Sequence, residues 1–495
     1  MSWRYVFSFF SYQQTSLTHF LFLRCLGLIY CFGFLVFVNQ WEGLLGSNGL
    51  SPAYLFLESV KESISFWDLP SIFWLYISDS FLFWSGCFGL VLSVLVVCGL
   101  TNAIAMFILW ALYMSIIHIG QQFYGFGWET LLLETGFLAI FLCPVFDWKP
   151  FSPKIPRPTL IFILILWLLF RNMFGAGLIK IRGDAVWSDF TALIYHFETQ
   201  PIPNPLSWFF HHLPIPILKF GVLFNHFAEL IVPFFLFGPR LCRHLAALII
   251  IVFQFTLILS GNLSWLNWLT IVQCIPAFDD SRFFLLQKLS LFKIIPSLKR
   301  TKLQLISQLS LCVLIAGLSI FPIHNMLNPH QKMNASFNSL HLVNTYGAFG
   351  SVGKTRYQLV FYGTTDTTIT DTTVWIPYQF KGQPSLINDR PPFFSPYHYR
   401  LDWHLWFAAM SDYRYHPWLV HLVYKLLHND PIISNLIKHN PFSSSPPTFI
   451  KVDRYDYQFT DSLSNGWWSS TFLNNYLPPL SKDNPSLLRF VEQLQ

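Results

Sequence analysis

The chain has 495 residues, of which 53% are hydrophobic and 11% are charged, and its formal net charge at pH 7 is +6. Soluble globular proteins carry roughly twice this share of charged residues. The composition therefore excludes an ordinary soluble protein and indicates a membrane protein. The positive charge does not indicate nucleic-acid binding, because the basic residues lie in loops between apolar runs and form no basic stripe with exposed aromatic residues.

Apolar runs that reach or approach the length of a membrane span recur through the first two thirds of the chain. A helix needs about 20 residues to cross the hydrocarbon core. The longer runs are residues 17–38, 81–97, 103–119, 160–179, 217–237, 245–259 and 305–321. Two shorter runs, residues 131–146 and 265–278, are either spans or re-entrant segments. The sequence therefore predicts a polytopic α-helical membrane bundle of about nine spans.

The basic residues of the short loops predict how this bundle is oriented, since Lys and Arg favour the cytoplasmic side. They are Arg4, Arg24, Lys149, Lys154, Arg157, Arg240, Arg243, Arg282, Lys288, Lys293, Lys299, Arg300 and Lys302. Nine crossings place all of them on one face. The opposite face then receives the loops 39–70 and 182–214 and everything after His324. The first apolar run is long enough to remain in the membrane as a signal anchor.

A change of composition near Phe321 predicts a domain boundary, with a membrane domain over residues 1–323 and an extramembrane domain over residues 324–495. Beyond this point the apolar runs stop and Pro, Asn, Ser, Thr, Asp and Tyr become common. The pattern predicts strands at 355–362, 373–380 and 448–459, and helices at 401–410 and 418–427. We therefore expect a small α+β C-terminal domain on the non-cytoplasmic face. It contains no cysteine, so no disulfide stabilises it.

Ionisable residues gather where one apolar run meets a polar loop, and such groups are costly at that depth. Lys180 and Arg182 either extend from a span end to the membrane interface or, for Lys180, supply a catalytic base. His226 and Glu229 are three residues apart and share a face of an α-helix. They form a structural hydrogen bond or, alternatively, a proton relay or part of a metal site. Lys180, His226 and Glu229 are thus the candidate catalytic residues, although no metal or cofactor is predicted.

Other polar residues have both a structural and a functional interpretation. Glu129 and Glu134 interrupt an apolar run, and we expect each to pair with Arg or Lys inside the bundle, with Arg171 as a partner, in preference to acid–base chemistry. Arg400 and Asp402 are predicted to form a surface pair. The neighbouring aromatic residues either fill the core of the terminal domain or form an exposed patch that binds client proteins. The client-binding candidates are Tyr397, Trp403, Trp406 and Phe407.

Colinear segments along most of the chain resemble the lipase maturation factor family. They are FYGFGWETLLLETGFLAIFLCP at 123–144, YHFETQPIPNPLSWFFHHLP at 195–214, NHFAEL at 225–230, VNTYGAFGSVGKTRY at 343–357 and SPYHYRLDWHLWFAAM at 395–410. The resemblance implies a protein of the endoplasmic reticulum membrane. Its lumenal C-terminal domain would bind folding lipases and promote their maturation and dimer assembly. The implied partners are membrane lipids and secreted client proteins, without nucleic acid.

A second resemblance concerns GAGLIKIRGDAVW at 175–187, which is similar to the membrane domain of vitamin K-dependent γ-carboxylases. It implies that Lys180 matches the lysine serving as a base in those enzymes. The alternative function is therefore a membrane-embedded enzyme acting on a lipid, quinone or peptide. The sequence contains no G-x-S-x-G, H-E-x-x-H or Walker motif. We favour the maturation factor, located in the endoplasmic reticulum of a eukaryotic host or in the inner membrane of a bacterial one.

Overall fold

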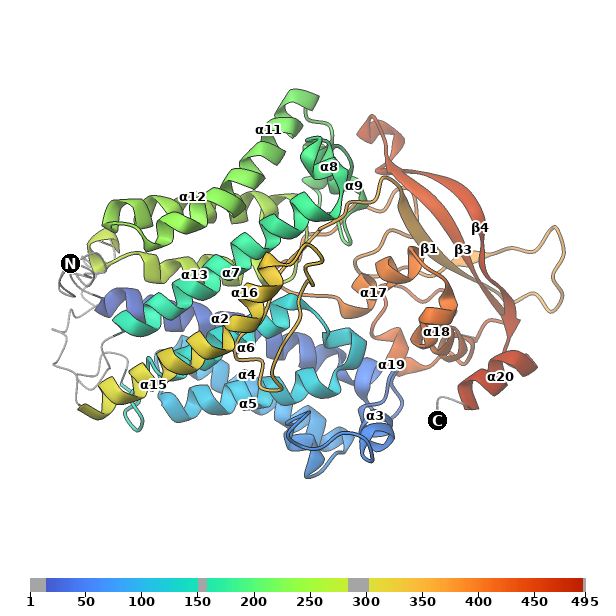
Figure 1. The fold of residues 1–495 in the computed structure, drawn as a ribbon. Helices are drawn as coiled ribbons and strands as arrows, with labels where there is room; N and C mark the ends of the chain where they lie inside the picture. The colour runs from blue at the N-terminus through green and yellow to red at the C-terminus, as the bar shows by residue number, and fades with distance from the viewer. Residues whose placement is uncertain (1–14, 150–157, 284–301, 493–495) are drawn as a thin grey trace.

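The computed structural model describes residues 15–149, 158–283 and 302–492. Several basic residues on which the predicted orientation depends lie outside these ranges: Arg4, Lys154, Arg157, Lys288, Lys293, Lys299 and Arg300. The described residues form a long helical bundle with a small sheet at one end, shown in Figure 1.

Within the described residues, six helices are long and apolar enough to cross a membrane. They are Ser16–Leu45 (α2), Asp79–Val97 (α4), Thr159–Gly183 (α7), Ile215–Phe237 (α11 with η3 and η4), Arg240–Ser260 (α12) and Lys302–Leu327 (α15 with α16). The other predicted runs form shorter helices, Ala103–Ile119 (α5), Gly127–Ile140 (α6) and Leu266–Cys274 (α13). A helical membrane bundle is thus confirmed, whereas the number of nine spans is not.

Short helices and turns occupy the end of the bundle that faces the sheet. They are Ala53–Val60 (α3), Ile72–Trp74 (η1), Gln121–Tyr124 (η2), Ala185–Ser188 (α8), Ala192–Thr199 (α9) and Ser207–His211 (α10). Polar side chains cap the N-termini of two of the bundle helices. The Ser78 hydroxyl accepts a bond from the Phe81 N–H at the start of α4, and the Asn102 side chain does the same for Ala105 at the start of α5.

The terminal region contains an antiparallel sheet in the order β2-β1-β3-β4. The strands are Arg356–Thr364 (β1), Ile376–Pro377 (β2), Phe449–Phe459 (β3) and Trp468–Ser481 (β4). The main helices are Arg400–Ala409 (α17), Pro417–Leu427 (α18), Pro431–Ser434 (α19) and Pro485–Glu492 (α20). The α+β prediction holds, but the strand expected at 373–380 shortens to β2. Strand β4 was not predicted, because its run of exposed Ser, Thr and Asn lacks the alternation of a half-buried strand.

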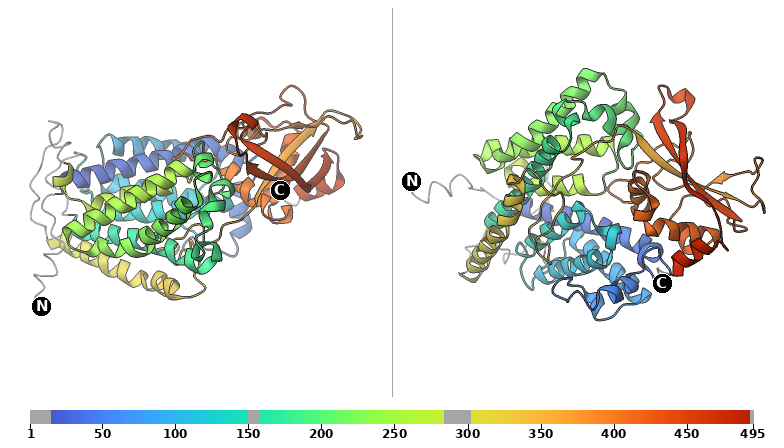
Figure 2. Two further views of the ribbon diagram at one scale, coloured as in Figure 1. Left: turned by 90° about the horizontal axis from the view of Figure 1, so that it is seen from above. Right: turned by 45° about the vertical axis from the view of Figure 1, so that its right-hand side comes forward.

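The terminal region and the bundle share one hydrophobic core. The largest cluster of buried apolar side chains includes Tyr30 and Leu132 from the bundle and Leu401 and Leu422 from α17 and α18. In Figure 2 the terminal helices lie between the sheet and the end of the bundle. The sheet is therefore fixed to the membrane part by continuous packing.

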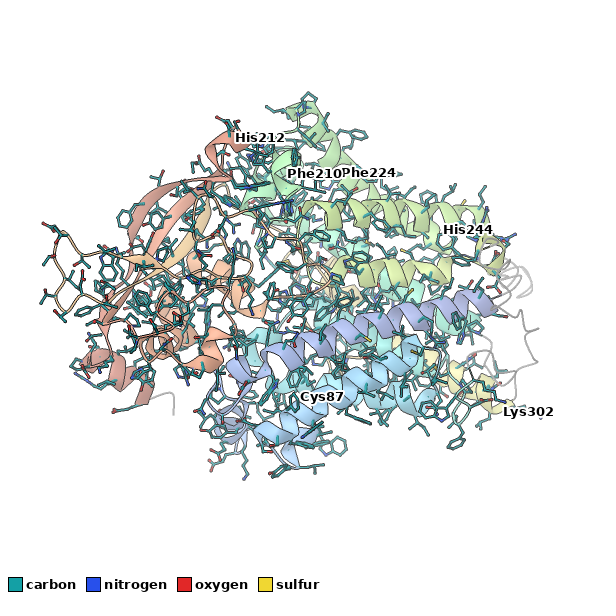
Figure 3. The ribbon with its side chains drawn as sticks, turned by 180° about the vertical axis from the view of Figure 1, so that it is seen from behind. Cys87, Phe210, His212, Phe224, His244 and Lys302 are labelled. Atoms are coloured by element: carbon teal, nitrogen blue, oxygen red, sulfur yellow. The ribbon has the colours of Figure 1, made fainter. Side chains whose placement is uncertain are left out.

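The two ends of the bundle differ in character. Figure 3 shows His244 and Lys302 at the end opposite the sheet. At the start of α12, Arg240 forms an ion pair with Asp279, with 2.6 Å between Nε and Oδ2, and the Nε of Arg282 contacts Nδ1 of His244 at 3.1 Å. Lys302 and the arginines beside Asp279 and His244 thus lie at the end away from the terminal sheet.

Candidate functional site

Lys180 lies in the last turns of α7 and is only 5% exposed. Its Nζ donates to Glu229 Oε1 at 2.7 Å and to Asn225 Oδ1 at 2.8 Å, and it lies 4.9 Å from the ring centroid of Trp187. Asn225 Nδ2 also donates to Glu229 Oε2 at 3.2 Å. The interpretation that Lys180 extends to the interface is therefore wrong, because a buried carboxylate holds the ammonium group inside the bundle. Arg182 is exposed and donates to Met326 O at 2.7 Å.

A change of helix type separates His226 from Glu229. Helix α11 ends at His226 and continues as the π-helical turn Phe227–Ile231 (η3). Nε2 of His226 lies 3.1 Å from Trp187 O, whereas Glu229 faces Lys180. The predicted trio is thus only partly brought together. Among the described residues no group of three His, Cys, Asp or Glu side chains could hold a metal ion. A π-turn inserts one residue into the helix, which changes the i, i+3 geometry on which the prediction of a shared face depended.

The small residues of α7 allow the terminal region to approach this helix closely. A Cβ atom placed on Gly175 would lie 2.7 Å from the backbone oxygen of Tyr346. The Gly175 carbonyl also accepts a bond from Gln331 Nε2 at 3.0 Å. The glycines of the 175–187 motif therefore have a packing role here, independent of any chemistry at Lys180.

Gly175→Ala is expected to destabilise the folded protein by about 1–3 kcal/mol, because the backbone at Tyr346 would have to move. Thermal unfolding in detergent measures this effect. Gly317→Ala in α15 is the matched control, since a Cβ there meets nothing within 4 Å and alanine favours the helix by up to about 1 kcal/mol. Equal unfolding temperatures for the two variants would contradict the close contact.

The segment after the last span enters the bundle at Glu134, which forms an ion pair with Arg171, as predicted. Both side chains are buried. Arg171 Nη1 also donates to Asn344 O at 2.6 Å. Glu134 Oε2 accepts bonds from the backbone N–H of Asn344 at 3.1 Å and from the hydroxyl of Tyr346 at 2.7 Å. The pair therefore fastens the NTYG segment of the terminal region to α6 and α7.

Glu129 forms its ion pair with Arg400 of α17, so the prediction of a Lys or Arg partner inside the bundle is wrong for this residue. Arg400 Nη1 donates to Glu129 Oε1 at 2.7 Å and to Phe123 O at 2.7 Å. The guanidinium carbon also lies 3.4 Å from the ring centroid of Tyr124, a cation–π contact. Arg400 and Glu129 are both completely buried. The predicted surface pair of Arg400 with Asp402 is therefore wrong, and Asp402 instead accepts backbone bonds from residues 382 and 383.

A third connection joins the sheet to the loop after α9. Arg356 at the start of β1 is 1% exposed and donates to the backbone oxygens of Gln200 at 2.6 Å and Glu198 at 3.1 Å. The carboxylate of Glu198 accepts a 2.6 Å bond from the Phe459 N–H of β3. Burial raises the pKa of Glu198 to about 7, against the opposing effects of the Phe459 bond and the Arg356 charge. Sequence reasoning missed this connection, because Arg356 and Glu198 are 158 residues apart.

Glu198→Gln is expected to remove part of the pH dependence of stability. The folded pKa of Glu198 is above the ordinary value of 4.5, so its contribution is fully present below pH 4.5 and is lost as the pH rises through about 7. The loss is on the order of 3 kcal/mol. Unfolding temperatures measured from pH 4 to 9 should therefore fall less steeply in Glu198→Gln than in the wild type or in the control Glu58→Gln, an exposed carboxylate. Parallel curves for all three would show that Glu198 does not titrate in this range.

The four client-binding candidates occupy different environments. Trp403 is 4% exposed, and its ring packs against Trp128 with centroids 5.0 Å apart. Trp406 is partly buried and donates to Thr199 O at 2.9 Å. The hydroxyl of Tyr397 accepts a 3.2 Å bond from a glutamine of α2, so it lies against the bundle. Phe407 is 37% exposed. Client binding by these residues stays a prediction, and Phe407 is the candidate that the fold leaves most accessible.

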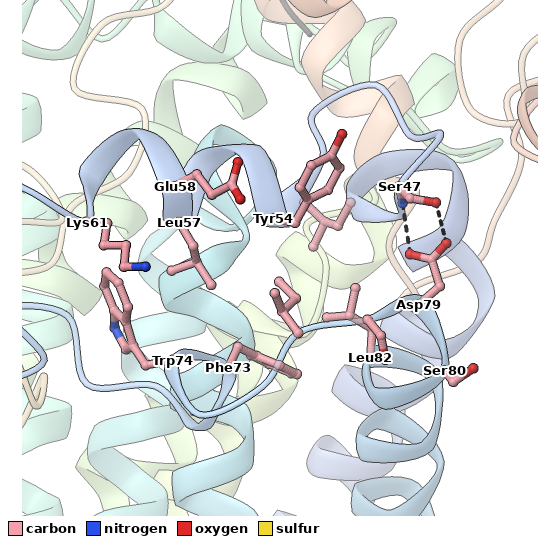
Figure 4. Close-up of a pocket in the computed structure, with 13 residues that line it drawn as sticks. Ser47, Tyr54, Leu57, Glu58, Lys61, Phe73, Trp74, Asp79, Ser80 and Leu82 are labelled. Carbon is pink, nitrogen blue, oxygen red and sulfur yellow. Dashed lines mark hydrogen bonds between the residues drawn. The ribbon is translucent and has the colours of Figure 1, made fainter.

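A cleft lies beside the start of α4, where the first loop covers the bundle (Figure 4). Its volume is about 750 Å³, and it combines apolar side chains with Glu58, Lys61 and Asp79. The backbone N–H and the hydroxyl of Ser47 donate to Asp79, at 2.8 and 2.5 Å. Asp79 therefore ties the end of α2 to α4 and forms one wall of the cleft. This mixed polar and apolar lining makes it a second candidate site.

Comparison with known families decides where the chain belongs. The model described as the lipase maturation factor transmembrane domain matches residues 17–285, and the lipase maturation factor C-terminal domain matches residues 342–478. The chain belongs to the lipase maturation factor family. Similar relatives include lipase maturation factor 1 of Bos taurus, 40% identical over 94% of this chain and 90% of the relative, and of Homo sapiens, 40% identical over 94% and 88%. Lipase maturation factor 2 of Xenopus laevis is 29% identical over 95% and 83%.

The lipase maturation factor family fits the helical membrane bundle, and the chain is an integral membrane protein. No solved structure matches it. The resemblance drawn from the sequence is confirmed, as is the prediction of a membrane-bound maturation factor. These relatives do not favour the alternative of a γ-carboxylase-like enzyme at Lys180.

Proposed function

We propose that the protein assists the folding and assembly of secreted lipases, and that its terminal region contacts them. The names of the relatives, lipase maturation factors 1 and 2, support lipases as the clients. The observation that carries the proposal is the buried attachment of the terminal region through Arg400, Arg356 and Asn344. These contacts hold the sheet and α17 in one position at the end of the bundle. A chaperone surface benefits from such an anchor, because binding then requires less ordering of the chaperone itself.

We also propose nine crossings, with the shorter helices α5, α6 and α13 spanning together with the six long ones. The membrane domain is then residues 1–323 and the client-binding domain residues 324–495. Lys302, Arg240 and Arg282 lie at the end opposite the sheet, which supports a cytoplasmic position for that end. The relatives come from animals, which supports the endoplasmic reticulum membrane with a lumenal terminal domain. Membrane lipids are the other partner.

The client surface that we propose centres on Phe407. Met410, one turn further along the chain, is 43% exposed, and Tyr415 in the following turn is 79% exposed. Trp406 lies beside Phe407, with ring centroids 5.0 Å apart. Exposed apolar side chains grouped in this way are typical of surfaces that bind partly folded proteins.

Expressing the chain with a dimeric secreted lipase in cells that lack their own maturation factor tests the proposal. We expect the wild type to raise the specific activity of the secreted lipase and Phe407→Asp to lower it at least about threefold, since a charge disrupts apolar contact. Leu488→Asp is the matched control, because Leu488 is 38% exposed and lies on α20. No gain of lipase activity with the wild type, or equal losses with both variants, would contradict the proposal.

A further inference from the structure

Among the residues that the structure describes, strand β4 has no neighbouring strand on its outer side. The order β2-β1-β3-β4 makes it the outer strand, and every residue from Ser469 to Asn475 is exposed. Figures 1 and 2 show this strand at the outer side of the sheet, away from the bundle. Exposed strand edges pair readily with other extended chains, and proteins usually block them with charges, prolines or bulges.

These protections are concentrated at one end of β4. Pro478 and Pro479 lie near its C-terminus, and the register with β3 shifts at Leu473, where Arg454 pairs with Asn474 and Tyr455 with Phe472. By contrast, residues 468–472 pair with β3 in unbroken register and contain no charge and no proline. The open part of the edge is therefore the segment Ser469 to Phe472, which we call the open edge.

The hydrogen bonds at the start of β4 indicate which backbone groups point outward. Trp468 and Phe459 are register partners, yet the Trp468 N–H donates to Ile387 O at 2.9 Å and the Phe459 N–H donates to a glutamate side chain. They are thus a pair without mutual hydrogen bonds, and such pairs alternate along an antiparallel ladder. The N–H and C=O groups of Ser470 and Phe472 therefore also point away from β3.

Another segment of the same chain already forms a hydrogen bond with this edge of β4. The carbonyl of Ile387 makes the first outward bond, at Trp468, and the edge continues beyond it. Beside the open edge, Phe472 is 52% exposed and its ring contacts Tyr455 with centroids 5.7 Å apart. The hydroxyl of Tyr455 lies 3.1 Å from that of Tyr362 on β1. The backbone of an extended chain bound here would lie beside the outward N–H and C=O groups of β4. Its side chains would lie beside the aromatic side chains on the face of the sheet.

We propose that the open edge binds an uncharged, extended segment of the client by adding it to the sheet as a further strand. The inference rests on the proposed function and specifies how the client is held. Main-chain bonds from Ser470 and Phe472 supply affinity without reading a particular sequence. The ring of Phe472 favours an apolar side chain at the facing position. Such a segment is one that a folded β-rich protein buries and that aggregates while it is exposed.

Two peptides test this mode of binding on the full-length protein in nanodiscs. The first is a fluorescent, uncharged hexapeptide that alternates threonine with valine and phenylalanine. The second has the same sequence with all backbone nitrogens methylated, which removes the donors on both edges. We expect the first peptide to bind and the second to bind at least about tenfold more weakly. Equal binding of the two peptides, or binding of neither, would overturn the proposal.

Substitutions at two neighbouring positions distinguish the backbone groups that point outward from those that bond to β3. Ser470→Pro removes an N–H that points away from β3, so the sheet keeps its bonds while peptide affinity falls at least about tenfold. Ser470→Thr retains the N–H and should bind like the wild type. Thr471→Pro removes a bond to β3 and should lower the unfolding temperature, which checks the assigned direction of the N–H groups. Unchanged peptide affinity in Ser470→Pro would contradict the proposal.

The lipase assay and the oligomeric state distinguish the remaining outcomes. If the wild type matures lipase and Ser470→Pro does so equally well, the open edge is not the client site, although the proposed function stands. If the wild type has no effect on lipase, the proposed function fails whatever the peptides do. A dimer in nanodiscs that Ser470→Pro dissociates would show that the edge pairs with a second copy, which also overturns the proposal.

Discussion

Arg400→Met is expected to destabilise the folded protein by about 3–5 kcal/mol, one of the two largest effects of a single substitution that we predict. The reason is that Glu129 would remain buried without its cation, since both side chains are inaccessible to solvent. The carbonyl of Phe123 would also lose its donor. Thermal or denaturant unfolding in detergent, followed by tryptophan fluorescence, measures the change.

Two further variants make this expectation specific. Removing both charges with Glu129→Gln and Arg400→Met together should recover a large part of the loss, because no uncompensated charge stays buried. The exposed pair of Arg414 with Asp412 provides the control, and Arg414→Met should leave the unfolding temperature nearly unchanged. If Arg400→Met and Arg414→Met unfolded alike, the buried pair would not be what holds the terminal region to the bundle.

Lys180→Met is expected to cost a similar amount, about 3–5 kcal/mol, because it leaves Glu229 buried beside Asn225 without a cation. The double variant Lys180→Met with Glu229→Met replaces the pair by apolar side chains. It should regain stability, and its lipase-maturation activity should return with it. Specific activity of the secreted lipase at matched protein level is the readout.

The double variant also distinguishes a structural lysine from a catalytic one. A catalytic base could not be replaced by methionine, so a stable double variant without maturation activity would support chemistry in the bundle. Recovery of both stability and activity would assign the pair to the architecture of α7 and η3. His226→Ala is an additional check. We expect this variant to retain maturation activity, because Nε2 of His226 contacts the backbone oxygen of Trp187.

Sequence patterns predicted the elements that depend on local periodicity. Apolar runs indicated where the bundle helices lie, and β-branched and aromatic runs predicted β1 and β3 to within two residues. The pairing of Glu134 with Arg171 also followed from physical chemistry, since a charge at that depth requires a partner. The family resemblance depended on long colinear segments, which single motifs could not have supplied.

The remaining features depend on contacts between distant parts of the chain. Arg400 meets Glu129 across 271 residues, and nothing in the YRLDW segment distinguishes it from a surface pair. The π-turn after His226 lies just before Pro233, which has no N–H to donate to the carbonyl of Glu229 four residues back. The prediction of a shared face assumed a regular α-helix and did not use this proline. Strand β4 was not predicted because it is exposed on both faces and therefore lacks the alternation of apolar and polar residues that identifies a strand.

Photo-crosslinking in cells tests most directly whether the terminal region contacts the client. A photoreactive phenylalanine analogue would replace Phe407 in one variant and Phe88 in another, since Phe88 is 53% exposed on α4 in the membrane bundle. Both are coexpressed with the dimeric lipase, irradiated and probed for a covalent adduct. We expect a lipase adduct from position 407 and none from position 88. An adduct only from position 88, or none from position 407 while lipase is being matured, would contradict it.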